Sequence, residues 1–227
     1  MILGDYPIEE IYHVLKKRRH VYEYDTDNVP KKQLIEDLLW KSWKVTPSKN
    51  NFMPYHCNVL GPDKQEDKDK VWEKSYIHKK GIDDSVDCPD KGDNPFFRQL
   101  KTAPYVLVFT QRVCEPNEYY RKRIEIGDWY EQMHADQMDN MLDITAIEVG
   151  MWMANLSAFA LDKGLNTSVI KCYPNKLSHW KDISWIEHPV VLIATIGQAK
   201  TLRREVLNDT QKKDDKKPEP EEIIKWI

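Results

Sequence analysis

The sequence contains little cysteine, and its four cysteines are scattered along the chain: Cys57, Cys88, Cys114 and Cys172. None of them forms a C-x-x-C pair, so the spacing suggests neither a zinc ribbon nor a thioredoxin-type redox motif. A few scattered cysteines fit reduced thiols in a cytosol-like compartment. We therefore expect a cytoplasmic protein.

The chain also lacks a long apolar run and a strong net charge. No apolar stretch approaches the roughly 20 residues that span a bilayer, and the N-terminal segment meets acidic residues too early for a secretory signal. The formal net charge is only −3 over 227 residues, so no global basic field points to nucleic acid. The expected partners therefore include neither a membrane nor nucleic acid.

What the sequence does contain is typical of a folded, soluble chain. Hydrophobic residues make up 41% and charged residues 31% of the sequence, and this length suits one domain with a substantial core. Eight tryptophans and eleven tyrosines suggest broad aromatic packing, at an interface or around a ring-shaped ligand.

The apolar periodicity predicts one α+β domain over 1–227, with a sheet wrapped by helices. A first helix runs into a basic cluster at 16–20. Further helices are predicted over 30–46, 68–79 and 130–163, and strands over 55–60, 103–109, 167–172 and 189–197. The polar connection 113–127 is long enough to be an insertion or a lid. By composition, the charged tail 200–227 is largely disordered.

The first candidate site is the basic cluster with Arg18, Arg19 and His20 at the end of the first helix. The helix dipole favours cations at a helix C-terminus without any ligand. Arginine also offers a planar fork of donors that suits a phosphate. Both interpretations remain open from these residues alone.

The second candidate is the stretch TPSKNNFMPY, which lies between a predicted helix and a predicted strand. Pro47 fixes the chain direction, Ser48 offers a hydroxyl, and Asn51 offers amide donors and acceptors. Taken alone, this stretch is an ordinary connection. Its meaning depends on the segments around it.

Several segments, in this order, resemble the nitroreductase family of FMN-dependent enzymes. LKKRRHVYEYD, VTPSKNNFMPYHCNVL and LKTAPYVLVF resemble the family's opening segment, its P-S-x-x-N loop and its first buried strand. The stretch from ITAIEVG to GLNTS resembles the long central helix, HPVVLIATIGQA the late strand, and KKPEPEEIIKW the closing segment. The resemblance covers nearly the whole chain. It implies a nitroreductase-like fold with a mostly antiparallel central sheet, and a homodimer with FMN at the subunit interface.

The resemblance also implies roles for the two candidate sites. Arg18, Arg19 and His20 match positions that hold the phosphate and ribityl oxygens of FMN. Pro47, Ser48 and Asn51 would contact the isoalloxazine or the ribityl chain from one subunit of the dimer.

Two further segments complete the implied cofactor site. Ile170, Lys171 and Cys172 follow the family's G-L-x-T segment, where a backbone N–H could hydrogen-bond N5 of the flavin and Lys171 could place a charge near N1. The final phosphate ligands would be Lys216 and Lys217, in a C-terminal arm, with Arg203 and Arg204 as competitors.

The implied activity is the reduction of FMN by NAD(P)H, followed by reduction of a small electron-poor acceptor such as a nitroaromatic or a quinone. No side chain is assigned as a catalytic acid or base, because water can protonate the product. The lid residues 119–123 could close over a carboxylate or a nitro group on the acceptor.

Two alternatives stay open at this point. One is a specialised family member that performs reductive dehalogenation or oxygen-dependent flavin chemistry. The other is a protein of the same fold that has lost FMN and acts as a scaffold, or that binds a metal near Glu131 and His134 beside Glu125 and Asp128. His20, which stands where the family has serine, motivates the second alternative. We expect no metal site, because E-x-x-H sites need ligands from several helices.

Overall fold

The protein is described by a computed structural model over residues 8–75, 98–115, 117–129, 142–171, 173–174, 176–206 and 219–224. The strands in this part are β1 (Val21–Tyr24), β2 (Tyr55–Leu60), β3 (Tyr105–Gln111), β4 (Asn166–Ile170), β5 (Val190–Gly197) and β6 (Ala199–Leu202). The helices are α1 (Ile8–Leu15), α2 (Lys32–Val45), the 3-10 helix η1 (Lys49–Asn51), α3 (Gln65–Ser75), α4 (Arg98–Thr102), α5 (Glu118–Glu125), α7 (Leu142–Asp162), α8 (Leu177–Trp180), α9 (Arg203–Val206) and α11 (Pro220–Ile223).

The central sheet has four strands in the order β2-β3-β5-β4, and every pair in it is antiparallel. A second sheet pairs β1 with β6, also antiparallel. In the central sheet β3 and β5 lie inside, and every residue of β3 is buried. This confirms the predicted mostly antiparallel sheet.

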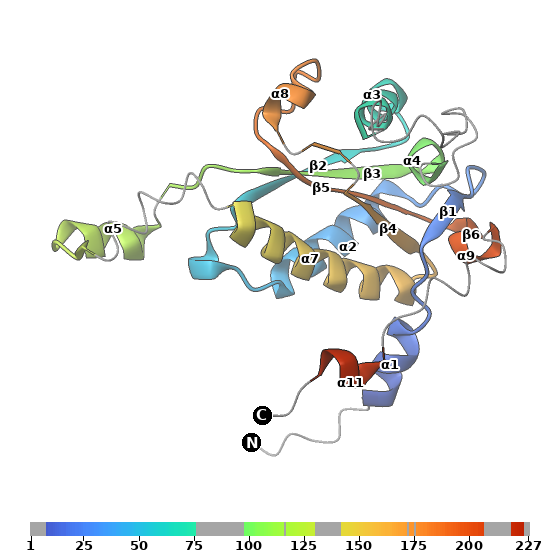
Figure 1. The fold of residues 1–227 in the computed structure, drawn as a ribbon, viewed down its shortest axis with the longest axis horizontal. Helices are drawn as coiled ribbons and strands as arrows, with labels where there is room; N and C mark the ends of the chain where they lie inside the picture. Colours follow the sequence, from blue (N-terminus) through green and yellow to red (C-terminus); the bar gives the residue numbers. More distant parts are fainter. Residues whose placement is uncertain are drawn as a thin grey trace.

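Helices cover both faces of the central sheet. Figure 1 shows α2 and α7 on one face and α3, α4 and α8 on the other. Successive side chains of β3 point to opposite faces of the sheet, so this strand contributes to a hydrophobic core on each face. Leu107 and Phe109 pack with α2 and α7, whereas Val106 and Val108 pack on the opposite side. The α+β fold with a sheet wrapped by helices is therefore confirmed.

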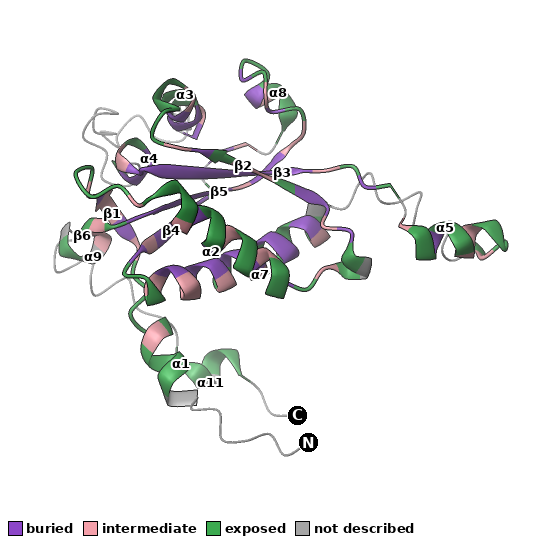
Figure 2. Ribbon diagram, turned by 180° about the vertical axis from the view of Figure 1, so that it is seen from behind, coloured by how far each residue is buried: buried purple, intermediate pink, exposed green. Residues whose placement is uncertain are grey.

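Helix α7 is the longest helix of the described chain, and its inner face is buried against the sheet (Figure 2). It ends at Asp162, and Gly164 follows with a left-handed φ of 71° while Leu165 N–H bonds the carbonyl of Ala160 at 2.8 Å. This is a glycine-ended helix cap. Residues 130–141 of the predicted helix lie outside the described residues.

By length and composition alone, α7 could cross a membrane, which the sequence analysis did not anticipate. Val149, Trp152 and Leu156 nevertheless belong to the core beneath the sheet, with exposures of 0, 6 and 0%. A helix that packs one face in a globular core passes the same composition test as a membrane span. Its place in the fold assigns α7 to the core.

The sequence analysis missed several short elements and misjudged parts of the tail. Strands β1 and β6 and helices η1, α4, α5 and α8 were not predicted. Residues 200–206 form part of β6 and α9, and Pro220–Ile223 form α11, so the disorder predicted from composition is wrong in both places. Helix α3 begins at Gln65, three residues before the predicted start at 68. Glu66 and Asp67 lie in its first turn, where the helix dipole favours acidic side chains.

At the end of β5, Gly197 packs closely against Tyr24 of β1, and this contact joins the two-stranded sheet to the central sheet. A Cβ on Gly197 would lie 2.6 Å from Cγ of Pro104 and 3.0 Å from the ring of Tyr24, so only glycine fits without a shift. The Tyr24 hydroxyl also hydrogen-bonds Thr195 at 2.8 Å. Strand β1, which follows the basic cluster, is thereby held against β5.

Candidate functional site

The loop between α2 and β2 is held by three side-chain hydrogen bonds, one within the loop and two to α7. Ser48 Oγ accepts the N–H of Met53 at 2.9 Å, and a carboxylate oxygen of Glu148 on α7 accepts the N–H of Lys49 at 2.7 Å. At the start of the loop, Thr46 Oγ1 accepts from Asn155 of α7 at 3.0 Å. The hydroxyl of Ser48, a predicted cofactor contact, thus also shapes the turn.

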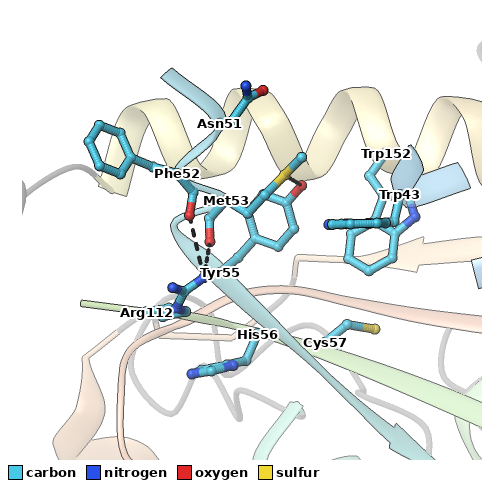
Figure 3. Close-up of a pocket in the computed structure, with 9 residues that line it drawn as sticks. All are labelled: Trp43, Asn51, Phe52, Met53, Tyr55, His56, Cys57, Arg112 and Trp152. Carbon is cyan, nitrogen blue, oxygen red and sulfur yellow. Dashed lines mark hydrogen bonds between the residues drawn. The ribbon is translucent and has the colours of Figure 1, made fainter. Parts of the chain in front are cut away.

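Two residues of this loop adopt left-handed backbone angles. Asn51 has φ 57° and Met53 has φ 48°, a conformation that costs a non-glycine residue on the order of 1–3 kcal/mol. The guanidinium of Arg112, just after β3, donates to the carbonyl of Phe52 at 3.3 Å and to that of Met53 at 3.2 Å (Figure 3). The surrounding contacts therefore stabilise the strained turn.

A pocket of about 450 Å³ opens beside the loop. Its lining residues are Trp43, Asn51, Phe52, Met53, Tyr55, His56, Cys57, Arg112 and Trp152. Figure 3 shows the Tyr55 ring between Arg112 on one side and the indoles of Trp43 and Trp152 on the other. Of the predicted residues, Asn51 lines this pocket. Ser48 shapes the turn beside it, and Pro47 does not line the pocket.

The titratable groups of the pocket are held in neutral forms. Burial raises the pKa of the Cys57 thiol and of the Tyr55 hydroxyl, and the charge of Glu148 adds to the effect on Tyr55. Burial and then the charge of Arg112 lower the pKa of His56. At pH 7 the lining residues therefore carry one full charge, the cation of Arg112.

The pocket also contains an unsatisfied donor. Trp152 is 6% exposed, and its indole N–H finds no hydrogen-bond acceptor among the residues that the structure describes. Its ring packs edge-on against Phe109 at 5.1 Å between centroids. A buried N–H without a partner is costly, so this group lowers the stability of the core beside the pocket.

The end of β4 lies at the same end of the sheet as the pocket. Tyr55 at the start of β2 pairs with Gln111, Thr110 pairs with Val190, and Lys171 donates its Nζ to the carbonyl of Val191 at 2.5 Å. Burial lowers the pKa of Lys171. The structure therefore brings the predicted segment at Lys171 to the end of the sheet where the loop lies, although β4 and β2 are the opposite edge strands.

Ile170 and Cys172 flank Lys171 in the predicted flavin-edge segment. Ile170 is buried and pairs with Ile193, so its side chain belongs to the core. Cys172 lies outside the described residues.

The basic cluster lies elsewhere in the chain, just after α1. Arg19 donates from Nη1 to the carbonyl of Arg18 at 2.8 Å and also to the carbonyl of Lys16, so it bonds the backbone of the turn that follows α1. Within the described chain, no carboxylate forms an ion pair with Arg18 or Arg19. Arg203 donates its backbone N–H to the carbonyl of His20 at 2.8 Å.

The pairing of β1 with β6 thus brings one predicted competitor, Arg203, next to the cluster. Lys216 and Lys217 fall outside the described residues, as does the side chain of Arg204. Lys216 with Lys217, and Arg203 with Arg204, therefore both stay predicted phosphate ligands.

The two groups of predicted residues lie at opposite ends of α7 (Figure 1). The loop and pocket meet its N-terminal half through Glu148 and Trp152. The basic cluster leads into Val21, whose N–H bonds Oγ of Ser168 at 2.9 Å, beyond the C-terminal end of α7. A helix of 21 residues is about 30 Å long. One chain alone therefore does not bring both groups around one small ligand.

The predicted lid contains α5, which projects away from the sheet layers (Figure 1). Its cations are already paired: Arg121 with Glu115 at 2.8 Å, and Arg123 with Asp128. At its base, Tyr120 stacks on Phe52 of the loop with ring centroids 5.1 Å apart. This contact ties α5 to the pocket loop.

The metal alternative falls mostly outside the described residues, because Glu131 and His134 are not among them. Asp128, which the alternative also used, is paired with Arg123. Within the described ranges, no three His, Cys, Asp or Glu side chains gather as metal ligands would.

Sequence reasoning missed two residues that shape the site, Arg112 and Glu148. Glu148 gave a usable signal, because it is the one charged residue between Asp143 and Asp162 in an apolar helix. Arg112 gave a weaker one, as the first cation after a fully buried strand.

Known proteins share the fold of this chain. The family model described as the nitroreductase family matches residues 15–198. No curated protein sequence matches the chain. A solved structure of a proposed NAD(P)H:FMN oxidoreductase from Staphylococcus epidermidis is similar with a TM-score of 0.63 and 20% identity, over 97% of each chain.

Two other solved structures share the fold. A nitroreductase family protein from Streptococcus pneumoniae has a TM-score of 0.62 and 15% identity, over 95% of this chain and 99% of its own. A proposed nitroreductase from Exiguobacterium sibiricum, solved in complex with FMN, has a TM-score of 0.54 and 18% identity, over 84% of this chain and 88% of its own.

The family model spans most of the sequence, and the neighbours share the antiparallel sheet between helix layers. The chain belongs to the nitroreductase family.

Proposed function

We propose that this protein is an FMN-dependent oxidoreductase that takes electrons from NAD(P)H and passes them to a small electron-poor acceptor, a nitroaromatic or a quinone. The observation that carries the proposal is the pocket beside the strained loop, which offers flat aromatic walls and one cation. The FMN complex of the Exiguobacterium neighbour supports the choice of cofactor.

The residues present fit FMN in three respects. Arg18 and Arg19 are exposed and free of ion pairs within the described chain, so their guanidinium groups are available to a phosphate. Asn51 offers an exposed amide at the pocket edge. Lys171 lies at the same end of the sheet, where a cation favours a reduced, anionic ring.

A homodimer follows from the separation of these groups. The loop and the basic cluster lie at opposite ends of α7, so an antiparallel arrangement of two α7 helices would bring the cluster of one subunit to the loop of the other. Large apolar side chains are exposed on α1, α2, α7 and α11: Ile11, Tyr12, Leu15, Trp40, Val45, Ile147 and Ile223. Burying them between subunits would stabilise such a dimer.

In this proposal FMN supplies the hydride-level redox chemistry, and the protein supplies orientation and charge. The loop presents Asn51 to the ring, the aromatic walls exclude water, and Arg112 provides the positive charge of the acceptor pocket. Cys57 and Tyr55 stay protonated, so neither competes as a nucleophile or base. We place the reaction in the cytoplasm, in keeping with the free thiols of Cys57 and Cys114.

A visible spectrum of the purified protein tests the proposal. We expect a yellow protein that releases FMN on denaturation, is bleached by NADH or NADPH under nitrogen, and regains its colour when a nitroaromatic or a quinone is added. A colourless protein that stays colourless after soaking in FMN would contradict it. Size-exclusion chromatography with light scattering should show two chains per particle.

A further inference from the structure

We propose that the pocket beside the loop selects an electron-poor aromatic acceptor that carries a carboxylate, and that Arg112 is the specificity-determining residue that binds this carboxylate. The inference rests on the proposed function, because it names the substrate class of the same site. The pocket volume of about 450 Å³ lies within the range of roughly 300–1,000 Å³ that is typical of small-molecule sites.

The first support is the state of the Arg112 guanidinium. Its side-chain hydrogen bonds to Phe52 and Met53 both leave from Nη1. Within the described residues, Nε and Nη2 have no acceptor, and no carboxylate pairs with Arg112. An arginine held in place by one nitrogen keeps the rest of its planar fork for a carboxylate.

The second support is the charge of the lining. The nine lining residues contain no aspartate or glutamate. The nearby carboxylate of Glu148 is buried and turned to the N–H of Lys49. His56 is neutral at pH 7 because burial and Arg112 lower its pKa. Among the nine lining residues a ligand anion would therefore meet one cation and no carboxylate.

The third support is the shape and polarity of the remaining wall. Trp43, Tyr55 and Trp152 offer flat faces, and Tyr55 and Trp152 lie 5.4 Å apart between ring centroids. The indole of Trp152 lies on the other side of Tyr55 from Arg112 (Figure 3). An aromatic ring between these faces with a carboxylate at its Arg112 end meets both the flat walls and the cation. A nitrobenzoate has this shape.

The lid cations fit this role less well. Arg121 and Lys122 on α5 already pair with Glu115 and Glu118, at 2.8 and 2.7 Å. The sequence analysis expected residues 119–123 to meet a carboxylate or nitro group, whereas this proposal gives the carboxylate to Arg112.

Isothermal calorimetry on the purified dimer tests the inference without turnover. The probes are 4-nitrobenzoate and its uncharged analogue 4-nitrobenzamide, titrated in the absence of NAD(P)H. We expect the carboxylate to bind about tenfold more tightly or better, as one charge-assisted contact allows. Equal dissociation constants for the two probes would overturn the proposal.

Arg112→Gln tests the residue, because glutamine keeps an N–H donor for the loop carbonyls but loses the charge. We expect nitrobenzoate to bind on the order of 10- to 100-fold more weakly, with little change for nitrobenzamide. Arg98→Gln is the matched control: Arg98 lies on α4, pairs with Glu23 at 3.4 Å and does not line the pocket. A preference for the carboxylate that survives Arg112→Gln would exclude Arg112 as its ligand.

Two further measurements keep the result decisive. If Arg112→Gln does not fold, the salt dependence of the natural protein decides, because screening should weaken nitrobenzoate binding and leave nitrobenzamide unchanged. Salt-independent binding of nitrobenzoate would then overturn the inference. A colourless protein that still prefers nitrobenzoate would remove the flavin proposal and keep this one, whereas a yellow protein without the preference would do the reverse.

Discussion

Glu148 and Lys49, 99 positions apart in the sequence, are joined by a hydrogen bond of 2.7 Å from the Lys49 N–H to a carboxylate oxygen. Glu148 is 2% exposed, and its second oxygen has no donor among the described residues. A buried acid on the core helix therefore fixes the start of the η1 turn. The position of the pocket loop depends on α7 as much as on the loop's own sequence.

Glu148→Ala should lower the free energy of unfolding by about 1–3 kcal/mol, because the Lys49 N–H loses its acceptor and a gap opens beside it. Glu148→Gln is the control: its side-chain oxygen can still accept from Lys49, so most of the stability should remain. Urea unfolding followed by tryptophan fluorescence measures both variants. An alanine variant as stable as the natural protein would show that the bond contributes nothing.

Asn51 separates backbone strain from ligand binding, since its side chain is exposed while its φ is 57°. Asn51→Ala should lose about 1 kcal/mol relative to Asn51→Gly, because glycine adopts left-handed angles without a steric penalty. Thermal unfolding without added ligand measures this difference. If the Asn51 amide contacts FMN, both variants should bind FMN more weakly, and to a similar degree.

Arg18 is more available to a phosphate than Arg19, because Arg19 already donates to the backbone of the turn after α1. We expect Arg18→Ala to weaken FMN binding by about 1.5–3 kcal/mol, the contribution of one charge-assisted hydrogen bond. Arg19→Ala should also weaken it, and Arg203→Ala tests whether β6 contributes. Dissociation constants from FMN fluorescence quenching report all three. An unchanged constant removes that residue from the site.

The buried Lys68 predicts how the free energy of unfolding changes with pH. It is 3% exposed, its Nζ donates to the carbonyl of Ala103 at 3.2 Å, and burial lowers its pKa. The unfolded chain then binds more protons between the folded pKa and roughly 10.4, so the Lys68 contribution to stability rises with pH across that window.

The comparison with Lys68→Arg isolates this effect, because arginine stays charged throughout. The stability of the natural protein relative to this variant should increase from pH 8 to pH 10.5, as measured by urea unfolding at each pH. A constant difference would mean that Lys68 titrates as an exposed lysine does.

The strands of the central sheet were predictable because their apolar runs are local signals. Strand β2 was predicted with its observed bounds, and β5 to within one residue. Strands β1 and β6 gave no such signal: they have four residues each, and Val21 pairs with Leu202 across almost the whole chain. Such a pairing depends on tertiary contacts, here the approach of Gly197 to Tyr24.

The candidate site was predictable only in part, for the same reason. The motif residues of the loop were visible in sequence, whereas Arg112 and Glu148 reach it from β3 and α7. The sequence suggested that cations from both ends of the chain converge. The structure shows the pairing of His20 with Arg203, and it separates this cluster from the loop by the length of α7.

The division of the predicted residues between the two ends of α7 has a genetic consequence in the proposed dimer. Each of its two sites would draw its loop from one chain and its arginines from the other. Mixing an Arg18→Ala chain with an Asn51→Ala chain should then yield heterodimers in which one site carries both lesions and the other carries none. Two defective alleles would complement each other, and up to half of the sites in such heterodimers would regain flavin.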